Sequence, residues 1–82
     1  MSLPQQLIRM QTHEYRKRVG DRIRKLRTER GFSQEGFADS CGLNRSYMGR
    51  VERGELNFTL DTLAKISRAL NMSASALLKG IL

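Results

Sequence analysis

Apolar residues recur at helical spacing through most of this chain. The first series has intervals of four, four and three residues, as one face of an α-helix requires. It consists of Tyr15, Val19, Ile23 and Leu26. Gly31 can adopt the left-handed conformation found just past a helix end, so this helix is expected to run from Tyr15 to Arg30.

Four further short helices are expected downstream, each preceded by a residue that commonly caps a helix N-terminus. The expected ranges are Gln34–Ser40, Arg45–Arg53, Leu60–Leu70 and Ala74–Lys79, and the caps are Ser33, Asn44, Thr59 and Ser73. An apolar face on the fourth helix consists of Leu60, Leu63, Ile66 and Leu70. No window alternates apolar and polar residues convincingly. The sequence therefore predicts an all-α fold of five short helices without a sheet.

The length of 82 residues suits one small domain. We expect residues 1–14 to form a polar N-terminal lead, which could be flexible, and residues 15–82 to form the domain. No apolar run approaches the roughly 18–20 residues that a membrane span needs. The first residues also lack the apolar stretch of a signal peptide, so the expected location is the cytoplasm and no membrane partner is expected.

The side chains offer little for catalysis or for metal binding. One cysteine, Cys41, and one histidine, His13, are too few ligands for a zinc site, so no metal and no other cofactor is expected. No His–carboxylate pair, Cys–His pair or phosphate-binding glycine motif is present, so the chain is not expected to be an enzyme or to bind a small-molecule substrate. The formal net charge is +7, which favours nucleic acid as a partner, with an acidic protein or a membrane surface as alternatives.

The segment from Ser33 to Gly54 has the organisation of a helix-turn-helix, with two short helices and Gly42 at the break between them. An advance of about 100° per residue divides the second of these helices into two faces. Met48 and Val51 lie on the face expected to pack inward, against Phe37 and Ala38 of the preceding helix. The opposite face is an arc of roughly 140° that holds Arg45, Ser46, Gly49, Arg50 and Arg53.

Residues 19–79 resemble the lambda-repressor-like, or Xre, family of helix-turn-helix regulators. The matching pieces are GDRIRKLRTERGFSQE, the turn ADSCGLNRS, the ERG that closes the third helix, and LDTLAKISRALNMS. The resemblance implies a compact five-helix DNA-binding domain that recognises double-stranded DNA. In this family the third helix enters the major groove and the second lies across the DNA backbone.

The resemblance also implies a set of contact residues. Gln34, at the start of the second helix, matches a phosphate anchor, and Asn57 matches a backbone-contacting loop after the third helix. Tyr47 has two expected roles, a ring at the edge of the core and a hydroxyl near a phosphate. The candidate DNA-binding residues are Ser33, Gln34, Asn44, Arg45, Ser46, Tyr47, Gly49, Arg50 and Asn57.

Arg27 lies at the edge of the buried face of the first helix, where an unpaired charge would be costly. Glu52, beside the inward face of the third helix, is the best partner, and the family pattern implies the same pair. We therefore expect an Arg27–Glu52 ion pair that holds the first helix to the third.

Several features of the sequence have two interpretations each. The apolar C-terminal end (Leu77, Leu78, Ile81 and Leu82) either closes the core or contributes to a two-fold contact, and we expect a homodimer on a partly palindromic operator. The tract 16–18 is either a solvated helix start or an arm that reaches DNA. Cys41 is either a buried inert thiol or a redox switch. The principal alternative to a DNA-binding regulator is a protein-interaction module that binds an acidic partner through its basic first helix.

Overall fold

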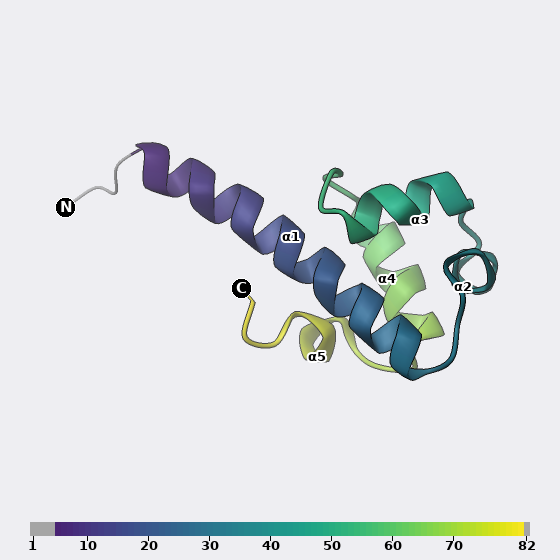
Figure 1. Cartoon of the computed structure of the whole chain (residues 1–82). Helices are drawn as coiled ribbons and strands as arrows, with labels where there is room; N and C mark the ends of the chain where they lie inside the picture. The colour runs from purple at the N-terminus through teal and green to yellow at the C-terminus, as the bar shows by residue number, and fades with distance from the viewer. Residues whose placement is uncertain (1–4, 82) are drawn as a thin grey trace.

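A computed structural model describes the backbone of residues 5–81 and the side chains of residues 14–81. Five α-helices and no strand occupy this part of the chain, which confirms the all-α fold (Figure 1). The helices are α1 (Gln5–Glu29), α2 (Gln34–Cys41), α3 (Arg45–Glu52), α4 (Leu60–Ala69) and α5 (Ala74–Leu78).

The expected caps begin the four later helices. The side-chain oxygen of each cap accepts a hydrogen bond from a backbone N–H in the first turn of its helix, a group that has no partner inside the helix. These caps are Ser33, Asn44, Thr59 and Ser73. Because each cap fixes where its helix begins, the predicted starts of these four helices are correct, and their predicted ends differ from the observed ones by one residue.

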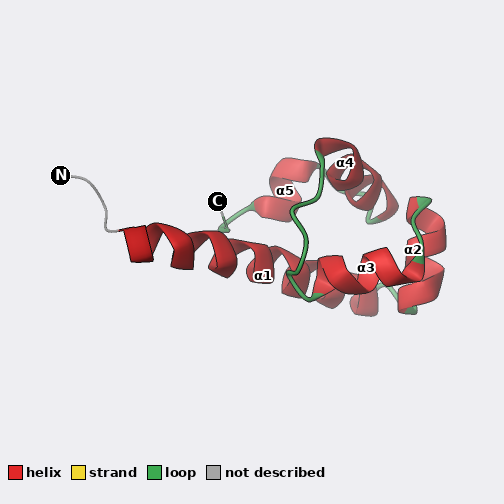
Figure 2. Ribbon diagram, turned by 90° about the horizontal axis from the view of Figure 1, so that it is seen from above, coloured by secondary structure: helices red, strands yellow, loops and turns green. Residues whose placement is uncertain are grey.

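The core lies where α3 packs against α1 and α2, while α4 packs against α2 and α5, and α5 returns to α1. Figure 2 shows α3 beside α1, with α4 and α5 together on another side of the molecule. The rings of Phe32 and Phe37 meet at 5.4 Å between centroids. The buried apolar residues are Val19, Ile23, Phe37, Ala38, Cys41, Met48, Val51, Ile66, Leu70 and Leu77.

Three expectations about the helices need correction. The first helix begins at Gln5 instead of Tyr15, and its N-terminal part extends past the other helices (Figure 1). Tyr15 is 37% exposed. Leu60 is 82% exposed although it was placed on the apolar face of α4. It is the first residue of that helix and lies roughly 120° around the axis from the buried Ile66, which takes it out of the core.

α1 and α3 approach closely at a glycine that the sequence analysis did not single out. A Cβ atom on Gly20 would lie 2.5 Å from the carbonyl oxygen of Glu52 and 2.6 Å from that of Val51. Gly54 makes a similar approach, since a Cβ atom there would lie 2.8 Å from Cα of Lys17. The backbones of the two helices are therefore in direct contact, and α1 sets the position of α3.

Replacing Gly20 by alanine is expected to lower the free energy of unfolding by about 1–3 kcal/mol, the usual cost of overpacking. The added methyl group would collide with backbone carbonyls, which cannot rotate away as a side chain can. Thermal unfolding followed by circular dichroism measures this effect. Gly36→Ala is the comparison, since a Cβ atom there meets one side-chain oxygen at 3.0 Å, the capping Oγ of Ser33, which can shift at a smaller cost than two backbone carbonyls. Equal melting temperatures for the two variants would contradict the close approach.

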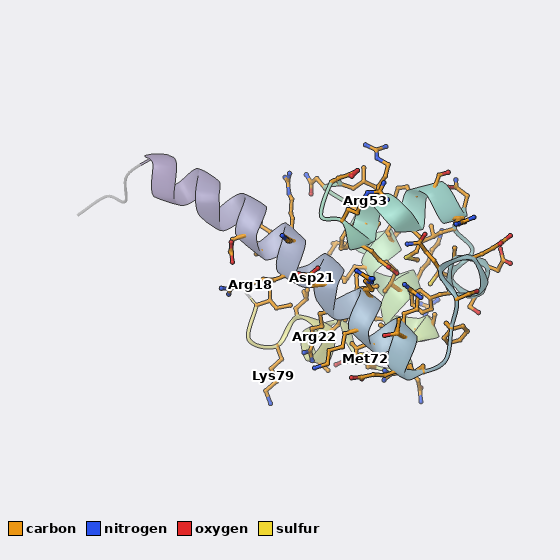
Figure 3. The ribbon with its side chains drawn as sticks, viewed as in Figure 1. Arg18, Asp21, Arg22, Arg53, Met72 and Lys79 are labelled. Carbon is orange, nitrogen blue, oxygen red and sulfur yellow. The ribbon has the colours of Figure 1, made fainter. Side chains whose placement is uncertain are left out.

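The C-terminal end packs onto the same core. Leu77 is 1% exposed, and Leu78 and Ile81 are partly buried against the core cluster. Arg22 donates an Nη2–H hydrogen bond to the carbonyl oxygen of Ala76 at 3.3 Å, which ties α1 to α5 (Figure 3). Residues 1–4 of the expected lead, and Leu82, lie outside the described residues. Within the described part, no helix is both long enough and apolar enough to span a bilayer.

Candidate nucleic-acid interface

The turn between α2 and α3 has the geometry of a helix-turn-helix. Gly42 adopts a left-handed conformation with φ of 71°, and its N–H points back to the carbonyl oxygens of Ala38 and Asp39. Leu43 follows, and Asn44 then caps α3 by accepting the N–H of Tyr47 on Oδ1 at 2.7 Å. The chain therefore reverses within a few residues and starts α3 at a defined point.

α3 divides into the two faces that the helical wheel predicts. Met48 and Val51 are buried, 0% and 1% exposed, and belong to the same core cluster as Phe37 and Ala38. Exposed residues line the first turn and the outer side, namely Asn44, Arg45, Ser46, Arg50 and Arg53. The structure therefore brings together side chains of the kinds that can hydrogen-bond to base edges and phosphates.

Gly49 differs from the expectation that it lies open in the middle of this face. It is buried, because side chains of the protein itself cover it. A Cβ atom on Gly49 would lie 3.1 Å from Nη1 of Arg53 and 3.5 Å from Oε1 of Gln34. The side chains of Arg53 and Gln34 therefore border the space beside this glycine.

Arg27 and Glu52 form a bidentate ion pair beneath the interface. Nε of Arg27 donates to Oε2 of Glu52 at 2.7 Å and Nη2 donates to Oε1 at 3.0 Å. The two side chains are only 10% and 3% exposed. A third guanidinium nitrogen, Nη1, donates to the carbonyl oxygen of Phe32 at 2.9 Å. The end of α1, the loop before α2, and α3 are thus joined through one arginine.

The remaining candidates lie around α2 and after α3. Gln34 is half-buried and donates an Nε2–H hydrogen bond to Oε1 of Glu52 at 3.3 Å, so its amide is turned partly inward. The Tyr47 ring packs against the core, and its hydroxyl lies 3.3 Å from Oγ1 of Thr62 on α4. Ser33, which precedes α2 in the sequence, and Asn57, which follows α3, are both exposed.

Known proteins share this helix-turn-helix arrangement. The family HTH_3, described as Helix-turn-helix, matches residues 23–77. The chain belongs to this helix-turn-helix family. The control protein C.SmaI of Serratia marcescens is 43% identical over 60 residues, which are 73% of this chain and 71% of that protein. The SPbeta prophage-derived regulator YonR of Bacillus subtilis is 43% identical over 61 residues, but the match spans only 56% of its length.

Solved structures of helix-turn-helix proteins have the same fold. The restriction-modification controller protein C.AhdI from Aeromonas hydrophila superposes with a TM-score of 0.72 at 44% identity, over 74% of this chain and 92% of that one. The biofilm regulator SinR, solved in complex with DNA, gives a TM-score of 0.70 at 34% identity, over 74% of this chain and 98% of that one. These matches confirm the resemblance to lambda-repressor-like regulators. The family consists of transcriptional regulators rather than enzymes.

Beside the helix-turn-helix, α1, α2 and α3 enclose a hollow of about 280 Å³. Glu52 and Arg27 are among the residues that line it, and because they form an ion pair the charge of Glu52 is compensated there. The residues that line it are Arg24, Arg27, Gln34, Gly49, Glu52 and Arg53. Arg24 and Arg53 were absent from the predicted contact residues, although Arg53 lies on the outer arc of α3 and Arg24 one turn before Arg27.

Arg53 and Glu55 form an exposed ion pair at the C-terminal end of α3, with Nε of Arg53 donating to Oε2 of Glu55 at 2.7 Å. The hydrogen bond from Arg53 lowers the pKa of the Glu55 carboxyl, and the charges of Arg53 and Arg50 lower it further. The same hydrogen bond raises the pKa of Arg53. Both groups therefore carry full charge at neutral pH.

Cys41 is buried in the helix-turn-helix, and burial raises the pKa of its thiol to about 11. The unfolded thiol ionises near 8.5. A proton is therefore released from Cys41 at lower pH in the unfolded state than in the folded state. Stability should consequently fall as the pH rises from the unfolded pKa toward the folded one.

We expect iodoacetamide to alkylate Cys41 slowly in the folded protein at pH 8.5 and rapidly in guanidinium chloride, because the thiolate is the nucleophile. The denaturation midpoint should also fall between pH 7.5 and 9.5, and less so in Cys41→Ala. Mass spectrometry and denaturant titration measure the two effects. Rapid alkylation without denaturant would favour the redox-switch alternative.

Proposed function

We propose that the protein binds double-stranded DNA sequence-specifically as a transcriptional regulator, with α3 in the major groove and α2 across the backbone. One observation carries the proposal. Arg45, Ser46 and Arg50 are exposed on one side of a helix whose opposite side is fixed in the core, and Asn44 is exposed at the N-terminal cap of that helix.

The dimensions support this placement of α3. An α-helix with its side chains is about 10–12 Å across, and the major groove is about 12 Å wide, so α3 fits within the groove. Arginine can donate two hydrogen bonds to guanine O6 and N7, and serine and asparagine can contact base edges. Gln34 and the positive end of α2 favour a phosphate beside the groove. SinR, which has the same fold, has been solved in complex with DNA, and this supports DNA as the partner.

The proposal includes a homodimer on a partly palindromic operator. Leu77 closes the core of the monomer, whereas Leu78 and Ile81 keep part of their apolar surface in solvent, which a two-fold contact would cover. Two copies joined at this end would present their α3 helices about 34 Å apart, one turn of DNA.

Selection of binding sites from a random duplex pool tests both parts of this proposal. A palindrome with half-sites about one turn apart is expected. Recovery of no common sequence would contradict specific binding, and a single asymmetric half-site would contradict the dimer. Sedimentation at tens of micromolar, with and without the selected duplex, measures assembly independently. A monomer under both conditions would also contradict the dimer.

A further inference from the structure

Gly49 stands at the centre of the outer face of α3, and an arginine from the next turn of the helix lies over it. Nη1 of Arg53 is 3.1 Å from the position that a Cβ atom of Gly49 would occupy. The amide of Gln34 borders the same space, with Oε1 at 3.5 Å from that position. A side chain at position 49 would thus compete for space with the guanidinium group of Arg53.

Arg53 is also held in this position from the other side. Its Nε donates to Oε2 of Glu55 at 2.7 Å, which leaves both Nη groups with hydrogens to donate. The side chain remains 61% exposed (Figure 3). A guanidinium group that donates through Nε keeps its Nη groups available for bidentate recognition of an oxyanion.

The surroundings of Arg53 suit an anion. It borders the hollow between α1, α2 and α3, together with Arg24, which forms no ion pair with the side chains that the structure describes. Glu52 in the same hollow is neutralised by Arg27. Glu55 offsets one charge, but its carboxylate lies on the Nε side of Arg53. Arg24 and the Nη groups of Arg53 therefore favour a phosphate group.

We propose that Arg53 binds a phosphate of the DNA backbone from its position over Gly49, an inference that rests on the proposed function. Glu55 is the positioning residue, because it orients the guanidinium group and does not itself touch the DNA. Gly49 acts through Arg53, by leaving the space across which that side chain lies. Gly49, a candidate DNA-binding residue from the sequence, is thereby assigned an indirect role.

Arg53→Ala tests the proposal through the salt dependence of binding, measured by fluorescence anisotropy on the selected duplex and on an unrelated one. A lost phosphate contact should weaken binding to both duplexes alike, by roughly three- to tenfold, and should reduce the slope of log K against log salt by about 0.9. Arg68→Ala on α4 removes the same charge outside this hollow and should leave the slope nearly unchanged. An unchanged slope in Arg53→Ala, or a loss confined to the selected duplex, would overturn the phosphate contact.

A double-mutant cycle tests the role of Gly49. Gly49→Leu places carbon atoms where Arg53 lies, so it should reproduce the weaker binding and shallower slope of Arg53→Ala. Added to Arg53→Ala, the leucine should cause little further loss. An equal loss in both backgrounds would mean that the leucine collides with the DNA directly, and would overturn the inference. Circular dichroism establishes that each variant is folded before binding is measured.

The positioning role of Glu55 has its own readout. Glu55→Gln keeps an oxygen that can accept the Nε–H of Arg53 and should retain the salt slope, whereas Glu55→Ala should reduce it toward that of Arg53→Ala. Equal slopes in the two variants would overturn this role.

Failure of the phosphate contact can be distinguished from failure of DNA recognition as a whole. If Arg50→Ala relaxes base preference while Arg53→Ala leaves the slope intact, only this inference fails.

Discussion

Replacing Glu52 by glutamine is expected to lower the free energy of unfolding by about 3–5 kcal/mol. Glutamine has nearly the same shape, so the change removes the charge and leaves the guanidinium of Arg27 buried without a counter-ion. The effect should be large because Arg27 joins three segments, through Glu52 on α3 and the carbonyl oxygen of Phe32 before α2. For a domain of this size, each 1 kcal/mol corresponds to about 4–8 °C in melting temperature.

The exposed Arg53–Glu55 ion pair provides a matched control for the loss of a charge. Glu55→Gln makes the same chemical change in a pair whose side chains are 61% and 45% exposed, where water already screens the charges. Its melting temperature should stay close to that of the unaltered protein. If Glu52→Gln also melted at the original temperature, the buried pair would not hold α1 to α3.

A double variant distinguishes the loss of the ion pair from the cost of leaving one buried charge unpaired. Arg27→Met combined with Glu52→Leu replaces the buried pair with apolar side chains and should recover part of the loss, because no unpaired charge remains. Full recovery is not expected, since the hydrogen bonds to Phe32 and from Gln34 are also removed. A double variant less stable than Glu52→Gln would show that packing at this site matters more than the unpaired charge.

The parts of the fold that depend on local sequence were predictable. Asn44 and Thr59 each cap a helix with their own side chain, so the residues beside them suffice to place the helix start. The two faces of α3 were also predictable, because periodicity alone decides which residues can point the same way. The placement of Met48 inward and of Arg50 outward is of this kind.

Features that depend on contacts between distant segments were predicted less well. A helical wheel does not show where neighbouring helices end, so Tyr15 and Leu60 were assigned to the core and are exposed. Gly20 had no local signal, since its role comes from carbonyl groups of α3 far away in the sequence. Gly49 was assigned to an open surface because the wheel ignores the side chains that lie across it.

Arg27 and Glu52 are an informative exception, because they form a contact between distant segments that was anticipated. Each has a charged side chain at a position whose helical neighbours are apolar, and burial of one charge requires a partner of opposite sign. Arg24 and Arg53 gave no such signal. An exposed arginine is unremarkable in a chain of net charge +7, so only their convergence on one hollow distinguishes them.

Replacing Arg45 or Arg50 by alanine is expected to relax base preference at one position of the operator each. A lost bidentate contact to guanine corresponds to about 1–3 kcal/mol of discrimination. The two residues are five positions apart on α3, which separates them by about 7.5 Å along the helix axis. They should therefore contact different base pairs, and their effects should add in the double variant to about 2–6 kcal/mol.

Arginine-to-lysine variants distinguish base reading from general attraction to DNA. Arg50→Lys keeps the positive charge but cannot form the planar bidentate contact, so it should lose discrimination while its salt slope stays nearly unchanged. Anisotropy titrations against the selected duplex and single-base variants measure both quantities, and Arg68→Ala serves again as the control for charge. If the alanine and lysine variants kept both affinity and preference, α3 would be scaffold. The remaining function for this basic chain would then be binding of an acidic partner through α1, where most of its arginines and lysines outside α3 are found.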